Sequence, residues 1–179
     1  MKGLVFTEFL EMVEEKFGYV TVDKIIESSE LPSGGKYTSI GNYSHRELMA
    51  LVTELSKIQQ IPTTEIMKSY GHHLIEVFIQ KFGVFFEETQ DVFKFYQNID
   101  QFIHLEVSKQ NVAANQHQFE FVQSENGADQ MIYYSKKKIA FLAEGLFAAT
   151  LEHFKAKATL EKEEILGEEP MVKFIISKI

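Results

Sequence analysis

The sequence contains no cysteine, no tryptophan and only three prolines among its 179 residues. The lack of cysteine excludes disulfides, thiolate-bound zinc, iron–sulfur clusters and thiol redox switches, and it suits a reducing compartment. No apolar run approaches the roughly 20 residues that a bilayer-spanning helix needs. The N-terminus reaches Glu8 and Glu11 too early for a signal peptide. We therefore expect a cytoplasmic protein without a membrane-spanning segment.

Positive charge is also scarce, because 18 Lys and Arg residues face 26 Asp and Glu residues, for a net charge of -8. Such a chain repels phosphate backbones and anionic headgroups, so we expect neither nucleic acid nor a membrane as its partner. Phenylalanine, by contrast, is abundant, with sixteen residues in a chain that is 45% hydrophobic. These side chains can fill one large core or line a cavity for a flat apolar ligand.

Helical spacing dominates the first two-thirds of the chain. Apolar residues recur every three or four positions in the ranges 6–17, 22–28, 48–55 and 66–78, and a further helix is expected from Asp91 to about Gln110. Ser44, followed three positions later by Glu47, forms a capping-box pattern that predicts the start of a helix. Gly83 is expected to end the helix that begins after Pro62.

The pattern changes towards the C-terminus. Alternating segments at 118–123 and 131–136 flank Asn126-Gly127, a dipeptide typical of tight turns, and two more strands are expected at 156–166 and 171–178. An amphipathic helix lies between the two pairs of strands, at 139–154. The sequence thus predicts an α+β fold, with a helical lobe at 1–62 and a second lobe at 63–179 that holds a small antiparallel four-stranded sheet with an inserted helix. We expect one domain over 1–179.

Two features are candidates for binding chemistry. His104 lies among large apolar neighbours, although an ordinary partly buried histidine is by itself the more frequent explanation. Tyr133, Ser135 and Lys137 alternate along a predicted strand, where two hydroxyls and an ammonium on one face can bind carboxylates. Taken alone, this triplet is more often a solvated strand end. The sequence contains no His-Glu-x-x-His pattern, no Ser/His/Asp pattern and no glycine-rich phosphate loop.

Together these features resemble the H-NOX (haem–nitric oxide/oxygen-binding) family, in its bacterial stand-alone type. Members carry an axial histidine on a helix and, further on, a Tyr-x-Ser-x-Arg motif that binds the haem propionates. The motif here is Tyr133-x-Ser135-x-Lys137, and lysine keeps the charge but lacks the planar fork of arginine. The resemblance extends over essentially the whole chain. It includes Gly71, Phe78, Phe82, Phe86 and the pair Gly145-Leu146.

The resemblance implies a haem b group (iron protoporphyrin IX) buried between the lobes, with His104 as the axial ligand of the iron. The implied distal side consists of apolar residues, namely Val5, Phe9, Leu74, Phe78, Leu142 and Leu146. Family members that hold O₂ present a distal tyrosine, and Leu142 occupies the matching position. The resemblance therefore implies binding of NO and CO rather than O₂.

The function implied is that of a gas sensor and not of an enzyme. A conformational change, with Gly71 and Gly145 as hinges, would be relayed to a partner that is typically a histidine kinase or a cyclic-di-nucleotide enzyme in relatives without their own effector domain. One alternative is a haem-free interaction module of the same fold, with its cavity empty or filled by lipid. Another is a haem enzyme such as a peroxidase, which the lack of distal His and Arg disfavours.

Overall fold

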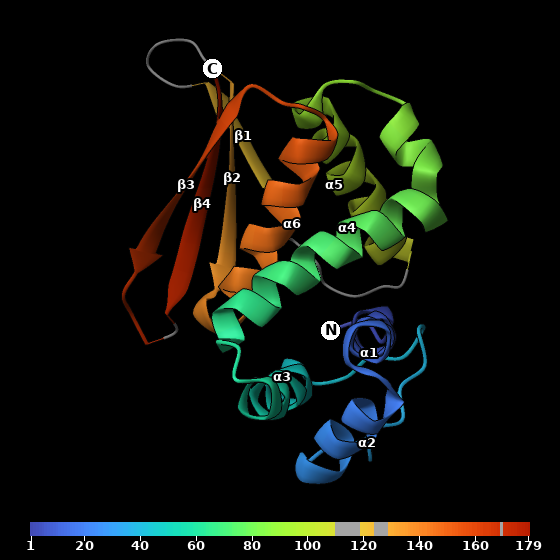
Figure 1. Cartoon of the computed structure of the whole chain (residues 1–179). Helices are drawn as coiled ribbons and strands as arrows, with labels where there is room; N and C mark the ends of the chain where they lie inside the picture. Colours follow the sequence, from blue (N-terminus) through green and yellow to red (C-terminus); the bar gives the residue numbers. More distant parts are fainter. Residues whose placement is uncertain (110–118, 124–128, 169) are drawn as a thin grey trace.

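The computed structural model describes residues 1–109, 119–123, 129–168 and 170–179, with side chains described in these ranges except at 101–109. It confirms the α+β prediction (Figure 1). The helices are α1 (Leu4–Phe17), α2 (Tyr19–Ser28), α3 (His45–Gln59), α4 (Thr63–Glu87), α5 (Val92–Lys109), the short 3₁₀ helix η1 (Lys137–Ile139) and α6 (Ala140–His153). The strands are β1 (Phe119–Gln123), β2 (Asp129–Lys136), β3 (Ala158–Ile165) and β4 (Met171–Lys178). None of the helices within these ranges has the length and apolar character that crossing a membrane requires.

The four strands form one antiparallel sheet in the order β1-β2-β4-β3. The helices lie on one side of this sheet, with α6 directly against it (Figure 1). Alternate residues of β4, namely Val172, Phe174 and Ile176, are buried, as expected for a sheet with one covered face. Tyr133 on β2 lies opposite Phe119 of β1 and Phe174 of β4.

Helices α4 and α6 cross in direct backbone contact. A Cβ atom added to Gly71 would lie 2.6 Å from both the carbonyl oxygen of Leu142 and the amide nitrogen of Leu146. A Cβ atom added to Gly145 would collide with the carbonyl oxygen of Lys68. Both positions therefore need glycine for the helices to approach this closely.

Two apolar cores lie on either side of this crossing. The first core packs α1, α2, α3 and the N-terminal part of α4, and it also takes Leu142 from α6. The second core fills the space between the later part of α4, α5, α6 and the sheet. Phe78 of α4 and Leu146 of α6 pack against both cores. The division into lobes at residue 62 stays a prediction.

Two local expectations need correction. Helix α4 continues past Gly83 to Glu87, with a kink at Phe82 (φ -133°, ψ 33°). The break expected at Gly83 is therefore present as a kink one residue earlier, but the helix does not end there. A glycine inside a helix costs only about 1 kcal/mol, and the continued helix buries Phe86. Ser44 does cap α3, accepting a hydrogen bond from the Arg46 amide at 3.2 Å.

The carboxylate of Glu47 does not complete the predicted capping box. It is buried and accepts hydrogen bonds from the Ser33 amide at 3.3 Å and the Tyr37 hydroxyl at 3.1 Å. The loop between α2 and α3 folds over this part of α3 and supplies those donors. Glu47 therefore fastens the loop to α3, a role that depends on tertiary packing and not on local spacing.

Candidate functional site

A cavity of about 330 Å³ lies within the second core, enclosed by α4, α5, α6, β1 and β2. This volume falls at the lower end of the roughly 300–1,000 Å³ typical of small-molecule sites. Its lining is mostly aromatic and comprises Ile75, Phe78, Phe82, Phe85, Phe86, Phe95, Tyr96, Ile99, Phe119, Tyr133, Ala143, Leu146, Phe147 and Thr150. The phenylalanine-rich composition thus serves a cavity as well as a solid core.

Local spacing explains why these rings meet. The α4 positions that line the cavity recur every three or four residues, and so do Phe95 and Ile99 on α5, which places each set on one helix face. The Phe119 and Tyr133 rings of neighbouring strands have centroids 5.3 Å apart, and Tyr133 lies 5.3 Å from Phe147 of α6. These separations are typical of favourable aromatic pairs, so the rings form continuous walls.

Two tyrosine hydroxyls provide the cavity's polar character. Burial raises the pKa of Tyr133, which keeps its hydroxyl protonated at neutral pH. Burial likewise raises the pKa of Tyr96, against a smaller lowering by nearby Thr150. Thr150 itself donates to the Leu146 carbonyl at 2.7 Å, and the Tyr96 hydroxyl makes no hydrogen bond of ordinary geometry with any residue in the described ranges. Among the described residues the Thr150 hydroxyl lies beside it, so an acceptor on a cavity ligand would strengthen the hydrogen bonding of this buried donor.

The predicted triplet is only partly brought together. Tyr133 lines the cavity, and Ser135 is buried on the same face of β2, where its hydroxyl donates to the Lys136 carbonyl at 3.3 Å. Lys137 lies beyond the strand, at the start of η1, and its ammonium is 2.6 Å from a carboxylate oxygen of Glu164 on β3. Binding of a propionate by this triplet stays a prediction.

All six predicted distal residues gather in one region. Phe9, Leu74 and Leu142 are buried members of the first core, against which Val5, Phe78 and Leu146 pack. Of these six, Phe78 and Leu146 also line the cavity. The set therefore lies across the α4–α6 pair from the cavity and reaches it through Phe78 and Leu146.

Two polar groups beside this set, the Tyr70 hydroxyl and the Glu8 carboxylate, are engaged, whereas the buried Nε2 atom of His73 has no hydrogen-bond partner among the described residues. The Tyr70 hydroxyl donates to the Val5 carbonyl, and its ring packs edge-on against Phe9 at 5.1 Å. The buried carboxylate of Glu8 on α1 pairs with Lys81 of α4 at 2.5 Å. The Tyr70 hydroxyl is therefore not a spare donor beside the predicted distal residues, and the Glu8 carboxylate is an acceptor already bound by Lys81.

His104 belongs to α5, and its side chain lies outside the described residues. Earlier residues of the same helix, Phe95, Tyr96 and Ile99, form one wall of the cavity. The helix that carries the predicted ligand therefore passes the cavity. The direction of the imidazole stays a prediction.

The chemistry of the site fits a haem better than a bare metal ion. Within the described ranges, no group of three or more His, Cys, Asp or Glu side chains is placed to hold a metal ion. A haem brings its own four nitrogen ligands and asks the protein for an apolar slot, an axial ligand and donors at its edge. The aromatic walls meet the first of these needs, and the two tyrosine hydroxyls are donors that meet the third.

Reasoning from sequence alone did not single out several cavity residues, among them Phe95, Tyr96, Ile99 and Phe147. Their signal was present in the helical spacing of apolar residues in α5 and α6. Such spacing identifies a buried face but does not distinguish a packed core from the wall of a cavity. No sequence pattern predicts that the Tyr96 side chain lies in the wall of a cavity.

A family model described as Haem-NO-binding matches residues 2–162. Among solved structures, the unliganded Fe(II) H-NOX protein from K. algicida is 36% identical, with 100% of this chain and 97% of that chain covered and a TM-score of 0.80. The IWP-051-bound H-NOX from Shewanella woodyi, in its Fe(II)CO ligation state, is also 36% identical, with 100% and 95% covered and a TM-score of 0.79. An S. oneidensis H-NOX protein in the Fe(II)NO ligation state has the same fold at 21% identity, with 100% of both chains covered and a TM-score of 0.74. A search among curated proteins finds no match.

Proposed function

The chain belongs to the haem-NO-binding (H-NOX) family, and from this premise we propose that it binds NO and CO at a ferrous haem ligated by His104 and relays the binding to a signalling partner. Members of this family are haem-based gas sensors and not enzymes. The observation that carries the proposal for this chain is the aromatic cavity beside α5, with the Tyr96 and Tyr133 side chains in its wall.

The chain's own residues have separate tasks. A bound haem b supplies the iron that diatomic gases coordinate. His104 would ligate that iron from α5, while Tyr133, Ser135 and Lys137 would hold the propionates. Lys137 would then exchange or share its present partner Glu164, and its ammonium offers a point contact in place of the two-pronged contact of arginine. The phenylalanine walls from α4 and α6 keep water out.

Gas selectivity follows from the predicted distal residues. Phe78 and Leu146, the predicted distal residues that line the cavity, carry no side-chain hydrogen-bond donor, and neither do Val5, Phe9 and Leu142 in the first core behind them. The Tyr70 hydroxyl in that core is already bound to the Val5 carbonyl. Distal donors stabilise bound O₂, whose complex is polarised, much more than they stabilise NO or CO. We expect NO and CO to bind and O₂ to bind poorly. The CO ligation state of the S. woodyi relative supports the CO part of this expectation.

The relay involves movement of α5 relative to α4 and the sheet. Gly71 and Gly145, expected from the sequence to be hinges, each lie against the backbone of the other helix, so in this proposal they hold α4 and α6 together as the frame against which α5 moves. The partner we expect is a histidine kinase or a cyclic-di-nucleotide enzyme in the cytoplasm. Pull-down of such an enzyme by the NO-loaded chain, compared with the unloaded chain, tests this step.

Absorption spectroscopy of the purified full chain tests the haem proposal. We expect a strong Soret band, shifts of that band with NO and CO, and no stable oxygenated spectrum in air. His104→Ala should abolish the ferrous spectrum of the wild type. His72→Ala serves as the control, because His72 is partly exposed on α4 and its Nδ1 lies 3.8 Å from a carboxylate oxygen of Glu152.

Three outcomes would contradict the proposal. A colourless chain that takes up no haem would favour the haem-free interaction module. An unchanged spectrum in His104→Ala would remove the axial role. Sustained peroxide turnover by the haem-loaded chain would favour an enzyme.

A further inference from the structure

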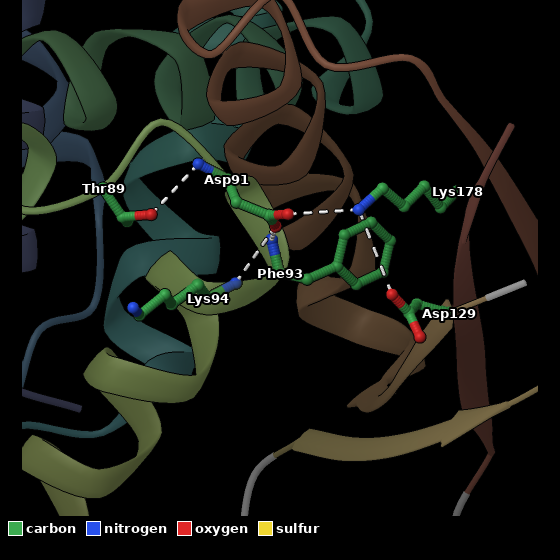
Figure 2. Close-up of polar contacts among 6 residues, drawn as sticks. All are labelled: Thr89, Asp91, Phe93, Lys94, Asp129 and Lys178. Carbon is green, nitrogen blue, oxygen red and sulfur yellow. Dashed lines mark hydrogen bonds and ion pairs between the residues drawn. The ribbon is translucent and has the colours of Figure 1, made fainter.

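A network of charged groups connects the first turn of α5 to the sheet (Figure 2). One carboxylate oxygen of Asp91 accepts hydrogen bonds from the amides of Phe93 at 2.8 Å and Lys94 at 3.3 Å, so Asp91 caps the helix. The other oxygen accepts from the Lys178 ammonium of β4 at 3.1 Å. Lys178 also lies 4.0 Å from a carboxylate oxygen of Asp129, the first residue of β2.

Apolar packing supports the same end of the helix. Val92, Phe93, Phe95 and Tyr96 are all buried in the second core. The Lys178 ammonium lies 6.0 Å from the centroid of the Phe93 ring, on the solvent side of this packing. The first two turns of α5 are therefore held by a cap, an ion pair and buried rings together.

The charged groups of this network satisfy one another. Burial alone would raise the pKa of Asp91, but the hydrogen bonds from Lys178 and from the Lys94 and Phe93 amides outweigh it and lower the pKa. The carboxylate is thus ionised at neutral pH. The Lys178 ammonium occupies the space between the two aspartates, so the pair has no need of a bound cation.

We propose that Asp91 and Lys178 are positioning residues for His104. They fix the N-terminal end of α5 to the C-terminal strand, so that α5 presents His104 to the haem from an anchored end and pivots about that end in the gas response. This inference rests on the proposed function. His104 is 13 positions beyond Asp91, which is roughly 20 Å along a helix, so a tilt of about 3° at the anchor displaces the imidazole by about 1 Å.

Two substitutions separate the ion pair from the cap. Asp91→Asn keeps a good capping side chain but removes the charge, and Lys178→Gln removes the charge from the other side. These changes shift the net charge in opposite directions. A general electrostatic effect would therefore change the measured properties of the two variants in opposite directions, whereas loss of the ion pair would change them in the same direction. Lys173→Gln is the matched control, because Lys173 is on the same strand and pairs with Glu163 of β3 at 3.5 Å.

The test uses the haem-loaded full chain and three measurements: the rate of haem transfer to apomyoglobin, the iron–histidine stretching frequency of the ferrous protein, and the fraction of its NO complex that is five-coordinate. We expect Asp91→Asn and Lys178→Gln to speed haem loss by about twofold to fivefold. This factor corresponds to the free energy that a partly exposed ion pair contributes. Both should shift the stretching frequency and the five-coordinate fraction in the same direction. The double variant should add little to either single change.

Two results would overturn the positioning role. One is wild-type behaviour of Asp91→Asn and Lys178→Gln in all three measurements, while His104→Ala still loses the ferrous spectrum. The other is an equal response in Lys173→Gln. If His104→Ala itself leaves the spectrum unchanged, the proposed function fails first, so the two failures are distinguishable.

Discussion

The crossing of α4 and α6 allows a sharp test of the packing at Gly145. In Gly145→Ala, the added methyl carbon would lie 2.9 Å from both the Cα and the carbonyl carbon of Lys68. The closest contact is with the Lys68 carbonyl oxygen at 2.2 Å. Carbon and oxygen atoms in contact are about 3.3–3.6 Å apart, so α6 must move away from α4 by roughly 1.1–1.4 Å. Overpacking of this kind costs about 1–3 kcal/mol.

A second effect of the substitution has the opposite sign. Alanine is favoured over glycine within a helix by about 1 kcal/mol. Gly83→Ala in α4 isolates this effect, because the nearest atom to its added Cβ is a Glu87 carboxylate oxygen at 4.0 Å. Gly83 follows the kink at Phe82, so its propensity gain need not match that of Gly145, but the difference between the two variants is dominated by the close approach. We expect Gly83→Ala to be the more stable by about 1–3 kcal/mol.

Urea unfolding of the haem-free full chain provides the assay, with the midpoint and slope fitted for both variants and the wild type. In thermal unfolding, the same free-energy difference corresponds to a difference in Tm of roughly 2–12 °C, because Tm shifts by about 2–4 °C per kcal/mol for a chain of this size. We expect Gly83→Ala to be somewhat more stable than the wild type. Equal stability of the two variants would refute the claim that glycine is needed for the contact with Lys68.

Three further predictions concern single side chains. Tyr96→Phe should stabilise the haem-free chain by about 1 kcal/mol in urea unfolding, because it removes a buried donor that has no partner of ordinary geometry; a loss of stability would show that the hydroxyl is satisfied. Burial alone would raise the pKa of Glu144, but hydrogen bonds from Lys68 and Lys162 lower it, so its stabilisation is present above the unfolded pKa of about 4.3 and is lost as the pH falls through the lower folded value. Glu144→Gln should cost about 1 kcal/mol at pH 7 and flatten the acid limb of the stability curve, and an unchanged acid limb would argue against this pairing. Under the proposed function, Lys137→Arg should slow haem transfer to apomyoglobin and Lys137→Gln should speed it, and identical rates would place Lys137 away from the propionates.

Local patterns in the sequence were sufficient for the elements of this fold. Helical stripes, alternating strands and the Ser44 cap each depend on residues a few positions apart, so they predicted α+β architecture and most element boundaries without knowledge of the tertiary structure. Tyr133 and Ser135 are two positions apart on β2, and strand side chains alternate between faces, so the sequence also placed them on one face of the sheet.

The site depended on contacts between segments far apart in the chain. The cavity forms only where α4, α5, α6 and two strands meet, and the ion pair of Asp91 with Lys178 joins residues 87 positions apart. Helix α4 passed Gly83 because burial of Phe86 outweighed the local cost of glycine. The sequence by itself thus determined which faces are apolar and which elements form. The tertiary structure alone decided which faces meet, since periodicity encodes the direction of a side chain but not its partner.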